Sequence, residues 1–395
     1  MDSPRQRFLD YVRRVPDARP VVSPFLPHGP LVTRTLEHLG LPAAGDHFEN
    51  EIRLARELAY EPMFMCGGSG LIFPWEEDDS RSDADWSVSV LATPEGEWVR
   101  KVSRQAGLFG DESGFPVRSE ADHHKLVAVC DQIRDREEVI RAYFRDCRQR
   151  IGEEGVIVIG HPHVTWLGYQ IGQQSMIFHA LDYPETYAAS MEAICRASLV
   201  LFEFAMEEGV DFMSESGYGM EMISPEQFAA QDLPYTRRLA DWTHERGGLM
   251  WYHNCGQTRQ LIEAGHFDAL GADVIETLAP PTRWRQPRPG RLQGLPGSGH
   301  LLQGKPEPGP VARGQPRRGG PTDAGDGPGR RGLPPHPLHG RHPFRGDACG
   351  ELPRLPAHRQ GGGGPAGLGG AAHPAPVALP APVPAEYPTR RLGAN

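Results

Sequence analysis

Long apolar runs are missing from this 395-residue sequence, and its six cysteines show no paired spacing. A membrane-spanning helix needs about 20 predominantly apolar residues, so we expect a protein that does not enter a membrane. Residues 1–10 show no secretory signal. We therefore expect a cytoplasmic protein whose cysteines are free thiols or metal ligands rather than a disulfide framework.

The composition of the chain changes near residue 282, where several residue types almost disappear. Residues 283–395 contain no Ile, no Met and one Lys, but 24 Gly and 22 Pro. Basic and acidic residues number 25 and 45 up to Thr282 and 16 and 6 after it, so the formal charges are −20 and +10. The composition predicts a globular domain over residues 1–282, followed by a disordered Gly-, Pro- and Arg-rich tail over residues 283–395.

The basic tail has three interpretations. A nucleic-acid-binding arm is one, but aromatic residues are not interleaved with its basic residues, so we expect no nucleic-acid partner. An ordinary disordered linker is the second. The third, which we favour, is translation in a shifted reading frame.

Strand-like and helix-like segments alternate along residues 1–282. Apolar strands are expected at residues 19–26, 62–66, 155–160, 210–214, 248–252 and 272–278, with long helices at 184–208 and 225–246. A hairpin near residues 86–102 is predicted as an insertion. The alternation predicts a parallel sheet with helical crossovers. Polar residues at the strand ends favour an α/β fold of the (β/α)8 TIM-like barrel type, and no glycine-rich phosphate loop is present.

The strongest local signal is His253 and Cys255 at the end of a strand. Residues two apart on a strand project to the same side, and imidazole with thiolate suits Zn²⁺. Glu276 closes the next strand, about 5 Å away in a parallel sheet, and completes a three-ligand site. The alternative is that the His and Cys pack in the core and that Glu276 is solvated or caps a helix.

Other polar residues follow neighbouring strands. Glu215 is a candidate catalytic residue, either a general acid or base or a substrate contact. His161, His163 and Tyr218 are candidate substrate-binding residues, although loop histidines often serve only local structure.

Several motifs resemble the C-terminal half of the uroporphyrinogen decarboxylase superfamily. They are Gly209-Val210-Asp211, Ser224-Pro225-Glu226, His253-Asn254-Cys255-Gly256, Gly271-Ala272-Asp273 and Pro280-Pro281. The resemblance is good over residues 150–282 and looser before them. It implies a barrel that, as printed, lacks its last strand.

Two branches of the superfamily differ in their sites. Uroporphyrinogen decarboxylases of porphyrin biosynthesis carry an arginine cluster and a pyrrole-binding Asp, which are absent from the corresponding residues 21–26 and 61–65. Corrinoid-dependent zinc methyltransferases carry H-x-C, and cobalamin-independent methionine synthases have a Glu matching Glu276. The resemblance to this methyltransferase-like branch implies zinc, a small-molecule thiol or methyl donor, and a corrinoid supplied by a partner protein. The alternatives are a metal-free decarboxylase and an inactive barrel that binds a partner.

A reading frame one base later restores further family motifs. Back-translation of residues 280–290 permits P-P-P-x-G-D-N-x-D-L, and residues 336–342 permit I-L-S-T-A-D. Residues 347–355 permit T-P-A-E-N-Y-R-A-F. Three motifs in order in one alternative frame favour a frameshift near Thr282.

The frameshift hypothesis predicts that the printed chain aggregates or is degraded when expressed, because the printed tail cannot supply the last strand and leaves sheet edges unpaired. A one-base correction near the codon for Thr282 should give soluble protein. Resequencing across Leu278 to Gly290 and measuring soluble yield test this. A confirmed printed frame with a soluble, monodisperse product would contradict it.

Overall fold

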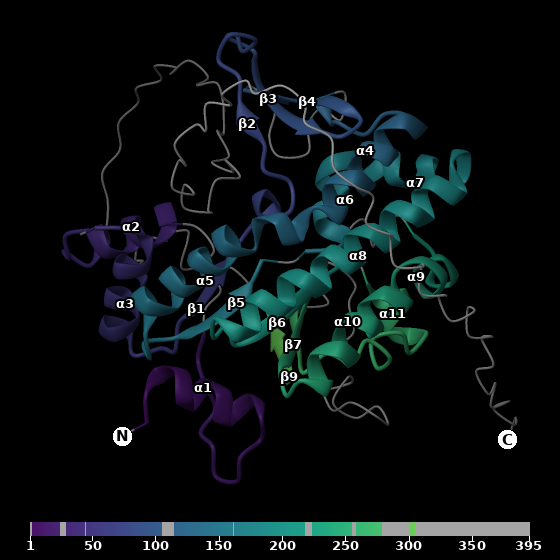
Figure 1. Cartoon of the computed structure of the whole chain (residues 1–395). Coiled ribbons are helices and arrows are strands. Elements are labelled where there is room, and N and C mark those ends of the chain that lie inside the picture. The colour runs from purple at the N-terminus through teal and green to yellow at the C-terminus, as the bar shows by residue number, and fades with distance from the viewer. Residues whose placement is uncertain are drawn as a thin grey trace, which may run out of the picture. The chain divides into compact units, whose positions relative to one another are not determined.

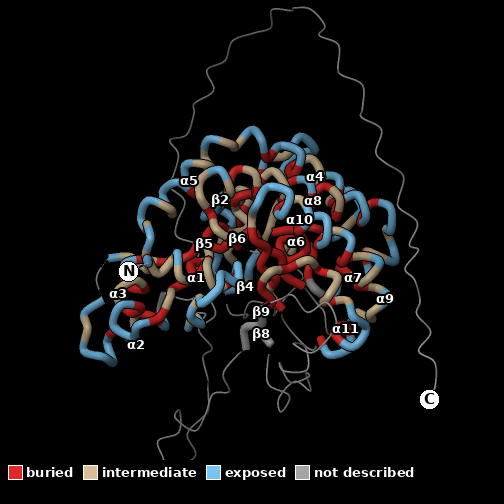
Figure 2. The backbone as a smooth tube through the Cα atoms, turned by 90° about the horizontal axis from the view of Figure 1, so that it is seen from below, coloured by how far each residue is buried: buried red, intermediate tan, exposed pale blue. Residues whose placement is uncertain are grey.

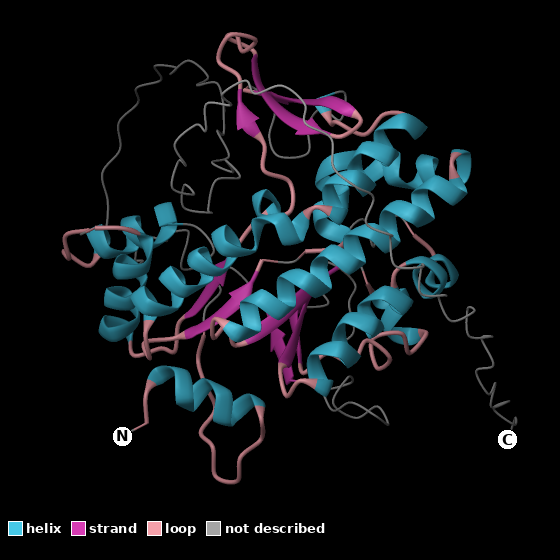
Figure 3. Ribbon diagram, viewed as in Figure 1, coloured by secondary structure: helices cyan, strands magenta, loops and turns pink. Residues whose placement is uncertain are grey.

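A computed structural model describes residues 2–23, 29–43, 45–104, 114–160, 162–217, 223–254, 258–278 and 301–304. Helices surround a central sheet, and a smaller sheet lies apart from it (Figures 1 and 3). The helices are α1 (Pro4–Val12), α2 (Gly29–His38), α3 (His47–Leu58), α4 (Glu120–Asp131), α5 (Glu137–Ile151), α6 (Val164–Ile171), α7 (Gln173–Asp182), α8 (Pro184–Glu207), α9 (Pro225–Gln231), α10 (Leu233–Glu245) and α11 (Arg259–Glu263). Short 3-10 helices lie at η1 (Ser69–Leu71) and η3 (Ile133–Arg136).

The main sheet is parallel and has the strand order β1-β5-β6-β7-β8-β9. Its strands are β1 (Met63–Cys66), β5 (Val156–Ile159), β6 (Phe212–Ser216), β7 (Leu249–His253), β8 (Val274–Leu278) and β9 (Leu301–Gly304). From β5 onward the spatial order follows the chain order. This is the α/β arrangement that the alternating sequence pattern predicted.

The predicted hairpin is confirmed. Strands β3 (Trp86–Thr93) and β4 (Gly96–Ser103) pair antiparallel, and β2 (Glu76–Glu77) extends them into a separate three-stranded sheet. Gly96 closes the turn with a φ of 104°, a conformation that favours glycine. The hairpin lies between β1 and β5 in the chain, so it is an insertion into the strand–helix alternation.

Three expectations differ from the structure. No strand forms over residues 19–23, the described part of the predicted first strand. The predicted helix over 225–246 is broken at Asp232, because Pro234 lacks an N–H and its ring excludes the carbonyl of a preceding turn. Strand β9 also forms after Thr282, because the open edge of β8 offers backbone groups that a short apolar segment can pair with.

Six parallel strands are present among the described residues, rather than eight. Residues 279–300 and 305–395 lie outside the described part of the chain, and so does most of the expected tail.

None of the helices described here is both long and apolar enough to cross a membrane. The four described cysteines, Cys66, Cys130, Cys147 and Cys195, are buried and form no disulfide.

The core of the main sheet is built against the N-terminal helix. Phe8 of α1 contacts Phe212 of β6 and Trp251 of β7, with ring centroids 5.9 and 6.4 Å apart. Alternate residues of β1, β5, β6, β7 and β8 join the same apolar cluster. Buried residues gather along these strands and around α6, while the outer sides of the helices are exposed (Figure 2).

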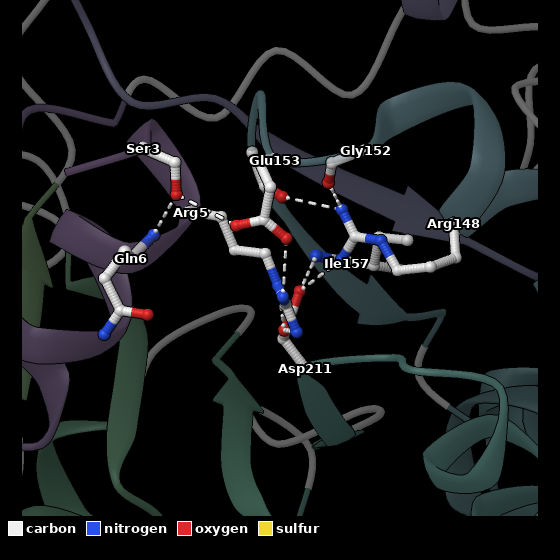
Figure 4. Close-up of polar contacts among 9 residues, drawn as sticks. Ser3, Arg5, Gln6, Arg148, Gly152, Glu153, Ile157 and Asp211 are labelled. Atoms are coloured by element: carbon white, nitrogen blue, oxygen red, sulfur yellow. Dashed lines mark hydrogen bonds and ion pairs between the residues drawn. The ribbon is translucent and has the colours of Figure 1, made fainter. Parts of the chain in front are cut away.

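Asp211 holds this arrangement together by its carboxylate, which is 2% exposed. It accepts hydrogen bonds from Arg5 Nε at 2.8 Å, Arg148 Nη1 at 3.0 Å and the Ile157 N–H at 2.9 Å (Figure 4). Arg5 also pairs with Glu153 at 2.8 Å. The network therefore connects α1, α5 and β5 at the start of β6.

Substitution Asp211→Ala should lower the free energy of unfolding by about 3 kcal/mol, because it leaves partly buried guanidinium groups without their counter-charge. Chemical denaturation measures the change. The matched control is Asp241→Ala, whose half-exposed side chain pairs with Arg237 on the surface of α10. That variant should lose less than about 1 kcal/mol, and equal losses in both variants would contradict the proposed importance of Asp211.

Candidate functional site

The sheet has two faces with different roles. We call the face that carries the α1 cluster, with Phe212, Trp251 and Val274, the inner face. Side chains alternate between faces along a strand, so Ser216, His253 and Glu276 share the inner face at the carboxyl ends of β6, β7 and β8. Glu215 and Tyr252 lie on the outer face, which the helices cover. Polar groups thus occupy both sides of the same sheet end.

The inner face brings two predicted metal ligands together. His253 and Glu276 are register partners, and His253 Nδ1 lies 2.7 Å from Glu276 Oε1. The Asn254 N–H also donates to the Glu276 carbonyl. Glu276 is completely buried, and its Oε2 has no hydrogen-bond partner among the described residues. A buried carboxylate oxygen without a partner is costly, which marks this position as a candidate for ligand binding.

The third predicted ligand, Cys255, lies outside the described residues. Within the described part of the chain, no group of three His, Cys, Asp or Glu side chains is arranged to hold a metal ion. His161 and Tyr218, predicted to contact the substrate, also lie outside it.

Glu215 and His163 come together on the outer face. His163 Nδ1 lies 3.5 Å from Glu215 Oε1, and both side chains are completely buried. Burial raises the pKa of Glu215, and the neighbouring His163 opposes this shift. The predicted catalytic carboxyl is therefore separated by the sheet from the His253–Glu276 pair. The sequence pattern did not reveal this, because strand ends were located without assigning the face of each residue.

His163 also has an unusual backbone conformation, with φ 56° and ψ −120°. Non-glycine residues rarely adopt positive φ, and the cost is of order 1–3 kcal/mol. Directly after it, the Val164 N–H donates to Glu215 Oε1 at 3.3 Å. The start of α6 is thus fixed to the end of β6 by contacts that offset this strain.

Asp232, at the break between α9 and α10, is a buried acid that the sequence did not single out. Burial raises the pKa of Asp232 to about 7, with His163 opposing the shift and Glu215 adding to it. The ring of Tyr235 lies 5.1 Å from that of His163. Two buried acids and an imidazole therefore influence each other between β6 and α10.

Two buried hydroxyl groups on the inner side were also missed. The Thr165 and Ser216 hydroxyls hydrogen-bond to each other, and Thr165 Oγ1 donates to the Ser216 carbonyl at 3.4 Å. Ser216 is the register partner of His253. Phe212, Ser214 and Ser216 are each two residues apart along β6 and so lie on one face. This spacing could have indicated that Ser216 shares the inner face with Phe212.

Parallel strands joined by helices define an α/β protein, and its polar side chains lie at the carboxyl ends of the strands, where barrel enzymes place their sites. The chain belongs to the uroporphyrinogen decarboxylase (URO-D) family, whose model matches residues 113–312, half of the chain. This match begins earlier and ends later than the resemblance seen in the motifs, and it includes β9.

Other comparisons add less. No curated protein sequence matches the chain. A solved methyltransferase from Methanosarcina mazei is similar over 71% of this chain and 77% of its own, with 14% sequence identity and a TM-score of 0.44. The family assignment rests on the family match.

The raised pKa of Asp232 predicts a pH-dependent stability. An unfolded Asp titrates near 3.9, so between about pH 4 and 7 the unfolded chain loses a proton that the folded protein keeps. This group therefore lowers stability as pH rises through that window, by up to about 1.4 kcal/mol per pH unit.

Asp232→Asn removes this titration. Relative to the unsubstituted protein, the variant should gain stability as pH rises from about 4 to 7 and hold that gain above 7. Denaturant unfolding at several pH values measures the difference, with the surface variant Asp241→Asn as the control. A constant difference between the Asp232 variant and the unsubstituted protein across the range would refute the assignment.

Proposed function

We propose that this protein is a zinc-dependent methyltransferase of the methyltransferase-like branch of its family, with His253, Cys255 and Glu276 as metal ligands. The observation that carries the proposal is the contact of His253 with Glu276 at the carboxyl ends of adjacent strands. Cys255 follows His253 by two residues. Imidazole, thiolate and carboxylate form a donor set that suits a catalytic zinc with one open position.

The residues fit a metal by their chemistry. Glu276 uses one oxygen for His253, and the other is buried without a partner in the described part of the chain. Coordination of a cation is one role that would satisfy such an atom. His253 remains partly accessible, with 15% of its side chain exposed, so the pair is reachable from the carboxyl side of the sheet.

The chemistry proposed for this site is alkylation of a thiol. Zinc, when bound, lowers the pKa of a thiol so that the thiolate nucleophile exists at neutral pH. In the transfer, the thiol loses its proton to solvent and a sulfur–carbon bond forms. The bond between the methyl group and its donor breaks, and its electron pair stays with the donor. Glu276 would hold the metal together with His253 and Cys255.

The identity of the partners follows the family resemblance. A small thiol is the proposed acceptor, and a corrinoid carried by a partner protein is the proposed methyl donor. The described strands would belong to an incomplete (β/α)8 barrel whose carboxyl-end mouth admits both. Glu215 remains a proposed functional residue. It would act by holding the start of α6 and not by direct contact with His253.

Substitutions of the proposed ligands should reduce bound zinc. His253→Ala, Cys255→Ser and Glu276→Gln should each lose most of the metal, because a three-ligand site is left with two ligands. Inductively coupled plasma mass spectrometry of purified protein gives the zinc-to-protein ratio. His124→Ala, on the exposed side of α4, is the matched control and should keep its zinc.

Unsubstituted protein that binds no zinc, even when zinc is supplied during expression and dialysis, would overturn this function. Retention of zinc in all three ligand variants would place the metal elsewhere. Methyl transfer to a thiol is then tested with methylated corrinoid as donor, by mass spectrometry of the product.

A further inference from the structure

Residues at the start of α6 contact the end of β6 on both faces of the sheet. His163 and Val164 contact Glu215 on the outer face, and Thr165 contacts Ser216 on the inner face. We call these five residues the α6–β6 clasp. Three consecutive residues of one element thus hold two consecutive residues of another.

The clasp is joined to the His253 strand. Ser216 is paired in register with His253, and the Gly217 N–H donates to the His253 carbonyl at 3.3 Å. Thr165 and Ser216 are 7% and 3% exposed, so their hydroxyls are buried beside the strand that carries the proposed ligand. Any shift of the end of β6 is therefore transmitted to the backbone of His253.

We propose that Thr165 and Ser216 are positioning residues of the metal site, and that Glu215 and His163 support them from the opposite face. This inference rests on the proposed zinc function. The hydroxyl pair fixes the backbone at His253, so the imidazole is presented to the metal in one orientation. Groups that hydrogen-bond directly to metal ligands commonly change metal affinity about 10–100-fold when they are removed, and we expect an effect of this order for a pair that acts through the backbone of the ligand.

Two observations separate this role from simple packing. A buried hydroxyl pair adds little net stability over an apolar pair of the same shape, so packing alone gives no reason for it. The clasp also begins at His163, whose positive φ is a strained conformation for a side chain of this size. Such strain occurs where surrounding contacts fix a backbone for a functional purpose.

The test uses an isosteric change. Thr165→Val removes the hydroxyl and keeps the shape, and it should weaken zinc binding about 10–100-fold in competition with a chromophoric chelator. The absorption spectrum of the Co²⁺-loaded variant should also shift, because this spectrum reports the geometry of the ligands. Thr165→Ser restores the hydroxyl and should recover both the affinity and the spectrum.

Thr243→Val is the matched control. The Thr243 hydroxyl is completely buried but donates to the Leu239 carbonyl within α10, away from the site. Its zinc affinity and cobalt spectrum should match those of the unsubstituted protein. Thermal unfolding checks that each variant is folded, and Ser216→Ala replaces Thr165→Val if the latter does not fold.

The two proposals fail in different ways. Unsubstituted protein that binds neither Zn²⁺ nor Co²⁺ overturns the proposed function, and the inference falls with it. Unsubstituted protein that binds zinc, together with a folded Thr165→Val variant of equal affinity and identical cobalt spectrum, overturns the inference alone.

Discussion

The buried carboxylate of Asp211 is the point on which the architecture of the sheet depends. It binds a guanidinium from α1, a second from α5 and a backbone N–H of β5, and it directly precedes β6. A charge at this position would be costly if any partner were absent. The contacts therefore require α1, α5, β5 and β6 to be in place together. Once they are, Phe8 packs against Phe212 and Trp251. The inner face is then apolar where α1 packs and polar at the carboxyl ends of its strands.

Much of this fold could be read from the sequence, because short apolar runs bounded by glycine and helical periodicity are local signals. The segments that became β1, β5, β6, β7 and β8 were predicted within a few residues. The failures have tertiary causes. The apolar run at residues 19–26 does not pair as a strand over its described part, and Pro234 divides a helix whose periodicity continues through the break. Leu301 and Leu302 pair with β8 although their surroundings are rich in glycine and proline.

The candidate site, like the fold, was predictable only where its signals are local in the sequence. The neighbouring positions of His253 and Glu276 were predictable, because His253 ends one strand and Glu276 lies in the second half of the next strand along the chain. The face occupied by Glu215 required the register, and the roles of Thr165, Ser216 and Asp232 required knowledge of where α6 and α10 pack. Hydroxyl groups and a lone acid carry no motif, so only their burial and contacts distinguish them. The polar end of the sheet consequently carries two polar clusters on opposite faces, one with His253 and Glu276 and one with Glu215 and His163 that is covered by helices.

The docking of α1 also has a consequence for how the protein is made. Arg5 and Asp211 are 206 positions apart in the chain. At a synthesis rate of about 5–20 residues per second, α1 would leave the ribosome on the order of ten to forty seconds before its partner strand exists. Its apolar side, with Phe8, Leu9 and Val12, is covered in the folded protein partly by Phe212 and Trp251, which are missing during that interval. Contacts of such long range slow folding, so the nascent chain exposes an apolar helix for which chaperones would compete before β6 and β7 emerge.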